Sequence, residues 1–439
     1  MQPAIDYAEN GFPVSERISR DWNLPNALPL IGCCTQRDPD SVNTWYINGR
    51  PPATGQTFRN RDLARSFRLL AQHGRYVFYN GEIARAIVAK STAFGGTMTL
   101  QDLANYTGEW VEPAHTNYHG FDVFELPPPS QAWNTTEILN LLEECVPRWA
   151  PGETLTSLGP RSPEYWHLIA EAKKLAYWDQ YKYNADPNFS KVPLDLLTSK
   201  DYAALQCDRV DPNRAGSLCA EGYNLCPKAQ TVAKVNGDGD TIVLSTADRW
   251  GNMVSWVNSN FAGFGSGITV PGYGFILHNR GSLFTLDPNS PNLIAPQHRP
   301  YNTLSTGFVM QNDRPLMTLG LMGGDMQAQG HAQVLVNIID LGANLQAATD
   351  MARFHHSEVP NTLQLESQLF DLVGAQLTNM GHQVQSIYGG GVGGYQAIMF
   401  TPNPGDSKAG SDAPDRVPGV NGFYRAGSDH RKDGAAVGW

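Results

Sequence analysis

The sequence predicts a mixed α/β fold, and three observations support this prediction. The chain has 439 residues, of which 41% are hydrophobic and 17% charged, so it can bury a large core. Within residues 55–90, the apolar residues Leu63, Phe67 and Leu70 recur at helical spacing. From residue 241 onward, short apolar segments of strand length alternate with helical ones. Periodicity therefore indicates both kinds of element, without fixing how they are layered.

The first half of the chain is predicted to be mainly helical. A second helix around residues 83–88 follows the break at Asn80-Gly81. Thr99 begins a short helix with the pattern of a capping box, because Asp102 stands three residues later. The other predicted elements of this half are helices at 135–146 and 163–184 and a polar linker at 208–239.

The second half is predicted to combine short strands with helices. Gly389 to Gly394 matches the pattern G-x-G-x-x-G, but a strand pattern follows it where a dinucleotide-binding unit needs a helix, so we interpret it as a turn. The predicted strands are 241–247, 252–258, 275–279, 304–310, 315–320, 383–387 and 395–400, and the predicted helices are 327–341, 345–353 and 366–380.

Charge and composition argue against several classes of function. The formal net charge is −10, whereas nucleic acids and anionic membranes require basic patches. No run of 18 apolar residues is present, and the segment Met1 to Ala4 lacks the charged and apolar regions of a secretion signal. We therefore expect small-molecule chemistry, with no nucleic-acid partner and no membrane span.

The cysteines match no zinc-binding spacing, so no metal site is expected. Free thiols are the default expectation, and the alternative for an exported protein is one disulfide within the polar region that holds the last three cysteines. The six residues are Cys33, Cys34, Cys145, Cys207, Cys219 and Cys226.

The most informative position is Thr241, which follows Asp240 and begins an apolar strand. If the chain is cut between these two residues, the threonine becomes N-terminal. Its α-amine, with a pKa near about 7.7–8.0, can then take the proton of its own hydroxyl and create a nucleophile for acyl transfer. An Asp-Thr pair alone is common, and an ordinary strand threonine is the alternative interpretation.

The segment from Thr241 to Asn252 resembles the start of the small chain of the γ-glutamyltranspeptidase family. The similarity extends over nearly the whole chain, through Pro3-Ala4-Ile5, Gly11-Phe12-Pro13-Val14, Phe78-Tyr79-Asn80-Gly81, Pro127 to Ser130, Ala170-Glu171-Ala172, Asp186-Pro187, Lys191-Val192-Pro193, Gly263 to Gly267, His298-Arg299-Pro300, Gly323-Gly324, Ala352 to His356 and Asp433 to Ala436.

The resemblance implies a four-layer α/β/β/α sandwich of the N-terminal nucleophile hydrolase type. It also implies a large-chain portion, 1–240, and a small chain, 241–439, which associate after self-cleavage as one interwoven domain. Family members carry a further segment before the position of Pro3 that supplies part of the central sheet and a substrate-binding arginine. The present sequence is therefore expected to be N-terminally short for the family.

The same resemblance assigns the catalytic roles. Asp240 and Thr241 form the processing site, and Thr241 is the nucleophile. Ser259, eighteen residues later, holds the place of a second hydroxyl residue, usually threonine, near the nucleophile's amine. Gly323 and Gly324 resemble the paired glycines whose backbone shapes the oxyanion hole. The alternatives are a structural strand serine and a simple tight turn before a helix.

The positions implied to bind substrate depart from the typical γ-glutamyl enzymes. Arg280 replaces a glutamine, and Leu283, beside Ser282, replaces the aspartate that holds the substrate's α-ammonium. A buried ammonium without a carboxylate is costly, so glutamate should be recognised poorly. The remaining implied substrate-binding positions are Phe261 in place of asparagine, and Asn302 and Thr303 in place of paired serines.

Arg280 is therefore interpreted as an anchor for an acyl group that carries an acid but no amine, with a structural salt bridge as the alternative. This pattern resembles the branch of the family that includes cephalosporin acylases and oxamate amidohydrolase. The predicted function is cofactor-free hydrolysis or transfer of a small amide through an acyl-enzyme, with water or an amine as acceptor. Genuine γ-glutamyl transfer and an uncut, catalytically silent relative remain alternatives, and His355 and His356 are predicted to be structural.

Overall fold

The computed structural model describes residues 1–439 except 25–26, 31–35, 217–239, 403–420 and 439. The chain divides into two compact units, each built from separate stretches of sequence. Both the predicted large-chain portion and the predicted small chain contribute to each unit. None of the helices in the described residues has the length and apolarity needed to cross a bilayer. The smaller unit comprises 1–111, 235–240 and 260–279, and the larger unit comprises 112–234, 241–259 and 280–439.

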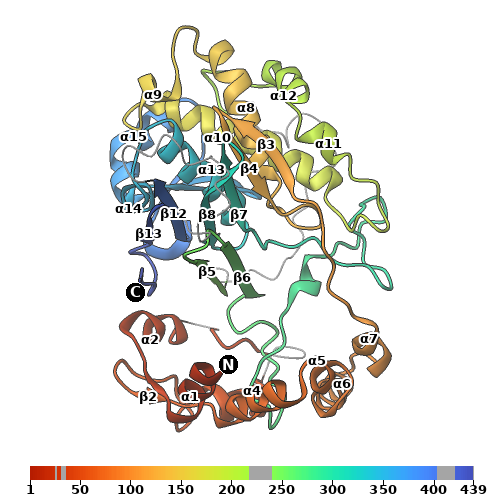
Figure 1. The fold of residues 1–439 in the computed structure, drawn as a ribbon. Helices are drawn as coiled ribbons and strands as arrows, with labels where there is room; N and C mark the ends of the chain where they lie inside the picture. Colours follow the sequence, from red (N-terminus) through yellow and green to blue (C-terminus); the bar gives the residue numbers. More distant parts are fainter. Residues whose placement is uncertain (25–26, 31–35, 217–239, 403–420, 439) are drawn as a thin grey trace, which may run out of the picture. The chain divides into compact units, whose positions relative to one another are not determined.

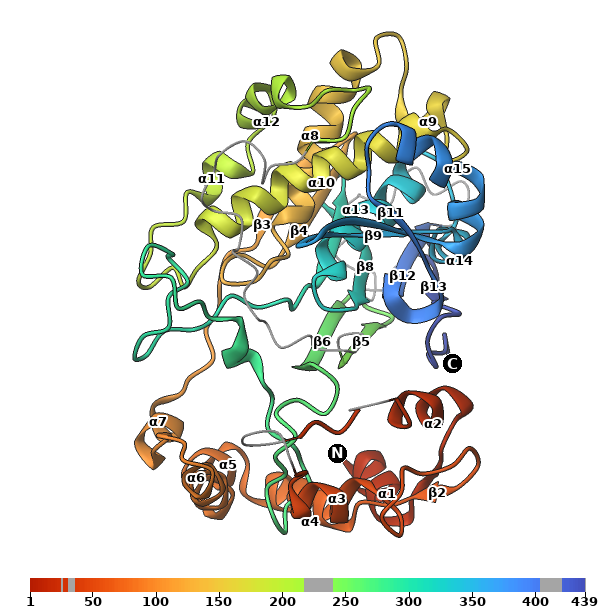
Figure 2. The same cartoon turned by 180° about the vertical axis from the view of Figure 1, so that it is seen from behind.

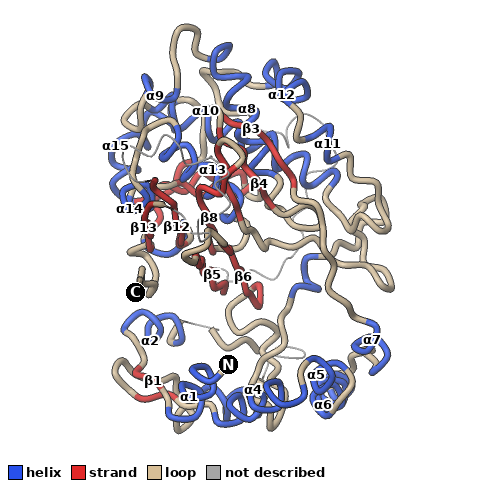
Figure 3. The backbone as a smooth tube through the Cα atoms, viewed as in Figure 1, coloured by secondary structure: helices blue, strands red, loops and turns tan. Residues whose placement is uncertain are grey.

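The smaller unit consists mainly of helices and loops, as Figure 3 shows. Its elements are α1 (Gln2–Asn10), β1 (Phe12–Pro13), α2 (Glu16–Trp22), α3 (Pro39–Trp45), β2 (Thr57–Phe58), α4 (Arg61–His73), α5 (Arg75–Tyr79), α6 (Glu82–Ala93) and α7 (Leu100–Asn105). The predicted break at Asn80-Gly81 is confirmed, because α5 ends at Tyr79 and α6 begins at Glu82. A side chain at Gly81 would lie 2.7 Å from the backbone of Val77. The predicted capping box of Thr99 and Asp102 is also confirmed.

The strand predicted at 275–279 is wrong. This segment forms only an isolated bridge, between Thr269 and Ile276. Gly272 and Gly274 have φ angles of 75° and 69°, so the chain turns back on itself just before the predicted strand. The carbonyl of Gly274 accepts a hydrogen bond from the Asn60 side chain, at 2.7 Å, instead of from a neighbouring strand.

The larger unit contains most of the strands (Figure 1). Its elements are β3 (Ala114–Tyr118), β4 (Phe121–Glu125), α8 (Asn134–Trp149), α9 (Leu155–Leu158), α10 (Pro163–Tyr183), α11 (Leu194–Leu197), α12 (Lys200–Gln206), β7 (Gly307–Gln311), β8 (Arg314–Met322), α13 (Met326–Ile339), α14 (Leu345–Asp350), β9 (Phe354–Glu358), β10 (Asn361–Glu366), α15 (Ser367–Asn379), β11 (Val384–Ile387), β12 (Gly394–Pro402) and β13 (Gly422–Ser428), together with most of β5 (Asp240–Ala247) and β6 (Met253–Phe261).

The centre of the larger unit is an antiparallel six-stranded sheet of order β13-β12-β8-β7-β4-β3. Helices α8 and α13 pack against it, and α10 packs against α8, as the view in Figure 2 shows. Gly330 lets α13 approach closely, because a side chain there would lie 2.6 Å from Leu321. The opposite face of β8 meets the β5–β6 pair, since a side chain on Gly320 would collide with Val243. The larger unit thus holds a helical layer, this six-stranded sheet, the two-stranded β5–β6 sheet and a three-stranded sheet of order β11-β10-β9.

The strand predicted to begin at 304 instead begins at Gly307. The preceding N–H groups are already bonded to side chains: that of Leu304 to Asn302 Oδ1 at 3.1 Å, and that of Ser305 to Gln327 Oε1 at 2.9 Å. The predicted helices at 135–146, 163–184, 327–341, 345–353 and 366–380 and the predicted strands at 241–247, 252–258, 315–320, 383–387 and 395–400 are confirmed, with small shifts at their ends.

Cys145 and Cys207 form a disulfide, with their Cα atoms 5.2 Å apart. The default expectation of free thiols is therefore wrong for these two residues, while Cys33, Cys34, Cys219 and Cys226 lie outside the described residues. The two cysteines are 62 residues apart in sequence and meet because α8 and α12 pack together. A link that closes so long a loop restricts the unfolded chain and thereby stabilises the fold.

Candidate active site

Thr241 and Ser259 form a direct contact in the larger unit. Thr241 is the second residue of β5 and is only 6% exposed. Its Oγ1 lies 3.0 Å from Ser259 Oγ and donates a hydrogen bond to it. The alternation of β5 buries Thr241 and Val243 and exposes Ile242 and Leu244. The structure thus brings together the predicted nucleophile and the predicted second hydroxyl residue, while the side chain of Asp240 is outside the described part.

Strand β5, which carries Thr241, packs against strand β8, which leads to the glycine pair. Val243 packs over Gly320, which is three residues before Gly323. On the neighbouring strand β6, Ser255 Oγ donates a hydrogen bond of 2.7 Å to the carbonyl of Leu319. These two contacts fix the register of β5 and β6 on β8.

Gly323 and Gly324 form the turn between β8 and α13, as the alternative interpretation of a tight turn expects. Their φ angles are 127° and 64°, and a side chain at Gly323 would lie 3.1 Å from both Gly393 and Met326. Glycine is therefore required at 323 by conformation and by space.

The peptide groups of this turn are oriented by the first turn of α13. The carbonyls of Gly323 and Gly324 accept hydrogen bonds from the N–H groups of Met326 and Gln327, at 3.1 and 3.2 Å. Because a trans peptide points its carbonyl and its N–H in opposite directions, the Gly324 N–H is turned away from Met326. Within the described part of the chain, neither glycine N–H donates a hydrogen bond. Two such N–H groups are what stabilisation of an oxyanion requires.

Arg280 and Thr303, two of the predicted substrate-binding residues, are in contact. Arg280 Nη1 lies 3.3 Å from Thr303 Oγ1, and the two residues are 7% and 1% exposed. Burial lowers the pKa of the Arg280 guanidinium to about 10, and Tyr301 opposes this shift. The side chain therefore remains a cation at neutral pH and has been largely removed from water.

The other predicted substrate-binding residues are more dispersed. Asn302 adjoins Thr303, but its side chain accepts the Leu304 N–H. Ser282 lies on the same short 3-10 helix as Arg280, and it is exposed. Phe261 belongs to the smaller unit, where its backbone has a φ of 76°.

Asp325, directly after the glycine pair, is a carboxylate that is not among the site residues predicted from the sequence. Its side chain is 43% exposed, and Oδ1 lies 3.1 Å from His355 Nε2. Burial opposes its ionisation, but the interactions with His355 and Lys173 hold the pKa of Asp325 below its usual value. His356 is buried, and Lys173 donates to its carbonyl at 2.8 Å. Both histidines thus contact residues of the fold, in keeping with the structural role predicted for them.

One group of metal-ligating side chains converges within the described residues: His167, Glu171 and His382. His167 Nδ1 and His382 Nε2 lie 2.9 Å apart and share a hydrogen bond. The Glu171 carboxylate is paired with Lys174 Nζ at 2.6 Å. The two histidines are therefore hydrogen bonded to each other, and the carboxylate already has a lysine partner. This arrangement indicates a buried polar network that stabilises the fold.

Comparison with known proteins gives consistent matches over the whole chain. The family model described as gamma-glutamyltranspeptidase matches residues 1–439. The glutathione hydrolase-like YwrD proenzyme of Bacillus subtilis is 31% identical, over 100% of this chain and 76% of that protein. The acylase ACY 1 proenzyme of a Pseudomonas species is 32% identical, over 92% of this chain and 67% of that protein.

The crystal structure of cephalosporin acylase from Bacillus halodurans has a similar fold. It superposes with a TM-score of 0.80 and 32% identity, over 100% of this chain and 74% of that chain. This similarity confirms the predicted fold class, an α/β fold of the N-terminal nucleophile hydrolase type.

Proposed function

The chain belongs to the gamma-glutamyltranspeptidase family, and we propose that it is a self-processing amide hydrolase or acyltransferase with Thr241 as its nucleophile. The observation that carries this proposal is the contact between Thr241 Oγ1 and Ser259 Oγ, made on strands that lie over the strand leading to Gly323 and Gly324. A hydroxyl, a neighbouring hydroxyl and two N–H groups without a described acceptor are the parts that acyl transfer needs.

In the first step, the Thr241 hydroxyl attacks the carbonyl carbon of Asp240. The C–N bond of this peptide breaks, and the acyl group moves from nitrogen to oxygen. Water then hydrolyses the resulting ester, which leaves a carboxylate on Asp240 and a free α-amine on Thr241. We assign to Ser259, whose Oγ already contacts Thr241 Oγ1, the role of a hydrogen-bond partner for the released amine.

In the second step, the α-amine accepts the proton of the Thr241 hydroxyl while the oxygen attacks the substrate amide. The N–H groups of Gly323 and Gly324 stabilise the tetrahedral oxyanion. The protonated amine then gives its proton to the leaving nitrogen, and an ester to Thr241 remains. Water or an amine cleaves this ester, so no cofactor is needed.

Self-processing is tested by mass spectrometry of the N-termini of the purified protein. We expect two associated fragments, the second of which begins at Thr241. A single uncut chain without amidase activity would support the silent-relative alternative, and an uncut chain with full activity would exclude the proposed mechanism.

For the acyl group, we propose an acid without an α-amine, bound by Arg280. The buried guanidinium next to Thr303 is suited to a carboxylate, and Leu283 offers no carboxylate to an α-ammonium. Genuine γ-glutamyl transfer remains the second candidate, favoured by Asp325, whose partly exposed carboxylate adjoins the glycine pair.

Replacement of Arg280 by Met should lower kcat/KM for a glutaryl anilide about 10- to 100-fold, because a charge-assisted hydrogen bond contributes about 1.5–3 kcal/mol. The kcat/KM of the same variant for an anilide with a neutral acyl group of equal length should change little. The wild-type enzyme should also prefer the glutaryl to the γ-glutamyl anilide. Arg425→Met, which alters an exposed arginine on β13, is the control. If kcat/KM fell equally for the charged and the neutral substrate and the melting temperature also fell, the role of Arg280 would be purely structural.

A further inference from the structure

Gln131, which is not among the site residues predicted from the sequence, connects two parts of the candidate active site. It is fully buried and lies between the turn at Pro127 to Ser130 and helix α8. Its Nε2 donates to the carbonyl of Gly324 at 2.7 Å and to the carbonyl of Thr303 at 3.0 Å. Both amide hydrogens are therefore used, one for each part of the site.

Further hydrogen bonds fix the orientation of this side chain. The Tyr301 hydroxyl donates to Gln131 Oε1 at 3.3 Å, which determines which end of the amide faces the two carbonyls. The backbone N–H of Gln131 donates to the carbonyl of Asn302 at 2.9 Å, and the N–H of Asn302 donates to the carbonyl of Pro129 at 2.9 Å. The segment 301–303 is thus bound to Gln131 through both its backbone and its side chain.

The two carbonyls belong to elements with different proposed roles. Gly324 belongs to the turn that presents the oxyanion-binding N–H groups, and its φ of 64° is a conformation that an unrestrained loop leaves easily. Thr303 contacts Arg280, the proposed anchor of the acyl group. One planar amide with two hydrogens therefore sets the spacing between the oxyanion donors and the acyl anchor.

We propose that Gln131 is a positioning residue, which holds the Gly323–Gly324 turn and the Arg280–Thr303 pair at the separation that the reacting amide requires. This inference rests on the proposed function, since the two parts matter to catalysis only if an acyl group lies between them. A misplacement of about 1 Å in such an arrangement lowers the rate about 100-fold.

The test compares Gln131→Met, Gln131→Glu and Gln333→Met with the wild type. Gln333 is the matched control because it is also buried and its Nε2 also donates to two backbone carbonyls, those of Gln329 and Phe354, neither of which belongs to this turn or to the segment 301–303. The readouts are kcat and KM per processed active site, the rate of processing and the melting temperature.

Gln131→Met should lower kcat about 100-fold with KM changed less than about threefold, and Gln333→Met should lower only the melting temperature. In Gln131→Glu, burial favours the protonated carboxyl, which keeps one donor. This variant should therefore be less impaired than Gln131→Met, and its kcat should fall as pH rises in a range where the wild type is constant.

Equal kcat values for Gln131→Met and Gln333→Met would overturn the inference, as would a Gln131→Glu variant whose pH profile matches the wild type. If Gln131→Met fails to fold, the pH profile of Gln131→Glu still decides the question. A wild-type enzyme that needs no Thr241 would refute the proposed function itself. An active wild type, an inactive Thr241→Ala variant and an unimpaired Gln131→Met variant would refute only the role of Gln131.

Discussion

Thr241→Ala is expected to leave the chain uncut between residues 240 and 241 and to abolish amide turnover. The substitution removes the hydroxyl that attacks both the Asp240 carbonyl and the substrate, and without cleavage no α-amine is released. Loss of a catalytic nucleophile lowers kcat by about 10⁴–10⁶-fold in enzymes that form an acyl intermediate. Mass spectrometry of the N-termini and a discontinuous amidase assay measure the two effects.

Two further substitutions make this result specific to the hydroxyl at 241. Thr241→Ser keeps both hydroxyl and amine, so processing and turnover should persist at reduced rates. Thr246→Ala alters an exposed threonine on the same strand and should leave both unchanged. Amide hydrolysis by the Thr241→Ala variant at more than about one hundredth of the wild-type rate would remove Thr241 from the mechanism.

The sequence was sufficient to predict elements whose signals are local. The capping box of Thr99 and Asp102, the break at Gly81 and the long helices were predicted because each depends on neighbouring residues. The β3–β4 hairpin was missed because its turn is His119-Gly120, where a histidine adopts a φ of 49° without a typical turn sequence. Local patterns thus fail where an unusual residue takes a special conformation.

The candidate site was predicted less completely, for a different physical reason. A family resemblance predicts Thr241 and Ser259, and their contact depends only on the pairing of two adjacent strands. Gln131 reaches Gly324 across 193 positions of sequence, and no local pattern marks such a hydrogen bond. The Cys145–Cys207 disulfide was missed for the same reason. Contacts that depend on how distant elements pack are not encoded in any one segment.

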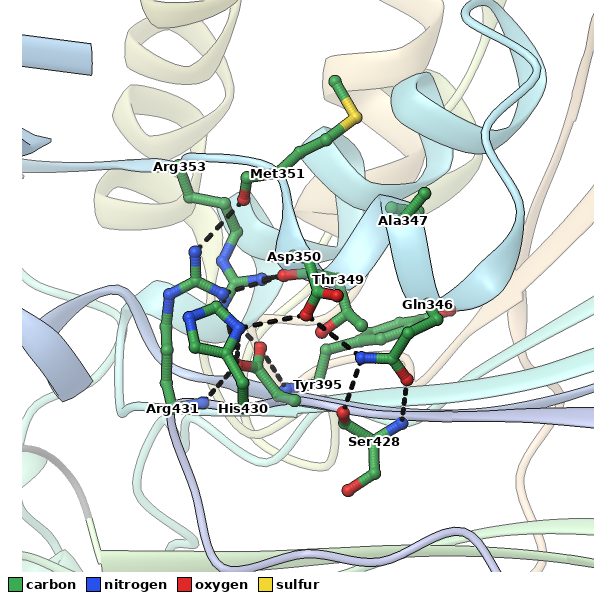
Figure 4. A network of polar contacts seen from close by, with 12 residues as sticks. Gln346, Ala347, Thr349, Asp350, Met351, Arg353, Tyr395, Ser428, His430 and Arg431 are labelled. Carbon is green, nitrogen blue, oxygen red and sulfur yellow. Dashed lines mark hydrogen bonds and ion pairs between the residues drawn. The ribbon is translucent and has the colours of Figure 1, made fainter. Parts of the chain in front are cut away.

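A second large effect is expected at Asp429, near the C-terminal strand. Its carboxylate is 1% exposed and accepts from Arg353 Nη2 at 2.7 Å and from Arg431 Nη1 at 3.1 Å. The backbone N–H of Tyr395 donates to the same carboxylate at 3.0 Å. Figure 4 shows Arg353, Arg431 and Tyr395 of this network together with the exposed pair of His430 and Asp350.

This network also supports the glycine pair of the candidate site. Arg353 is fully buried and donates to the carbonyls of Val392 and Gly393, at 3.1 and 3.4 Å. Gly393 lies directly against Gly323, because a side chain on Gly323 would approach its Cα to 3.1 Å. Loss of the charge at Asp429 should therefore disturb both stability and the turn that carries the proposed oxyanion donors.

Asp429→Asn should lower the free energy of unfolding by about 3–5 kcal/mol, because it leaves the Arg353 guanidinium buried without its counter-charge. His430→Ala, which alters the neighbouring exposed pair, should change it by less than about 0.5 kcal/mol. Denaturant unfolding monitored by tryptophan fluorescence measures both values. A loss below about 1 kcal/mol for Asp429→Asn would show that the arginines are adequately solvated without the carboxylate.

The pH dependence provides an independent check on the same carboxylate. Burial raises the pKa of Asp429, but Arg353 and Arg431 outweigh this effect and hold the pKa at about 2, below the ordinary value of 3.8. The folded state therefore binds this proton more weakly than the unfolded state, so the stabilisation is fully present above about pH 4 and is lost as pH falls towards 2. The stability difference between wild type and Asp429→Asn should accordingly be constant above pH 4 and shrink below it, since the protonated acid resembles the amide. A difference that stays constant down to pH 2 would mean that hydrogen-bond geometry, and not charge, carries the contribution of Asp429.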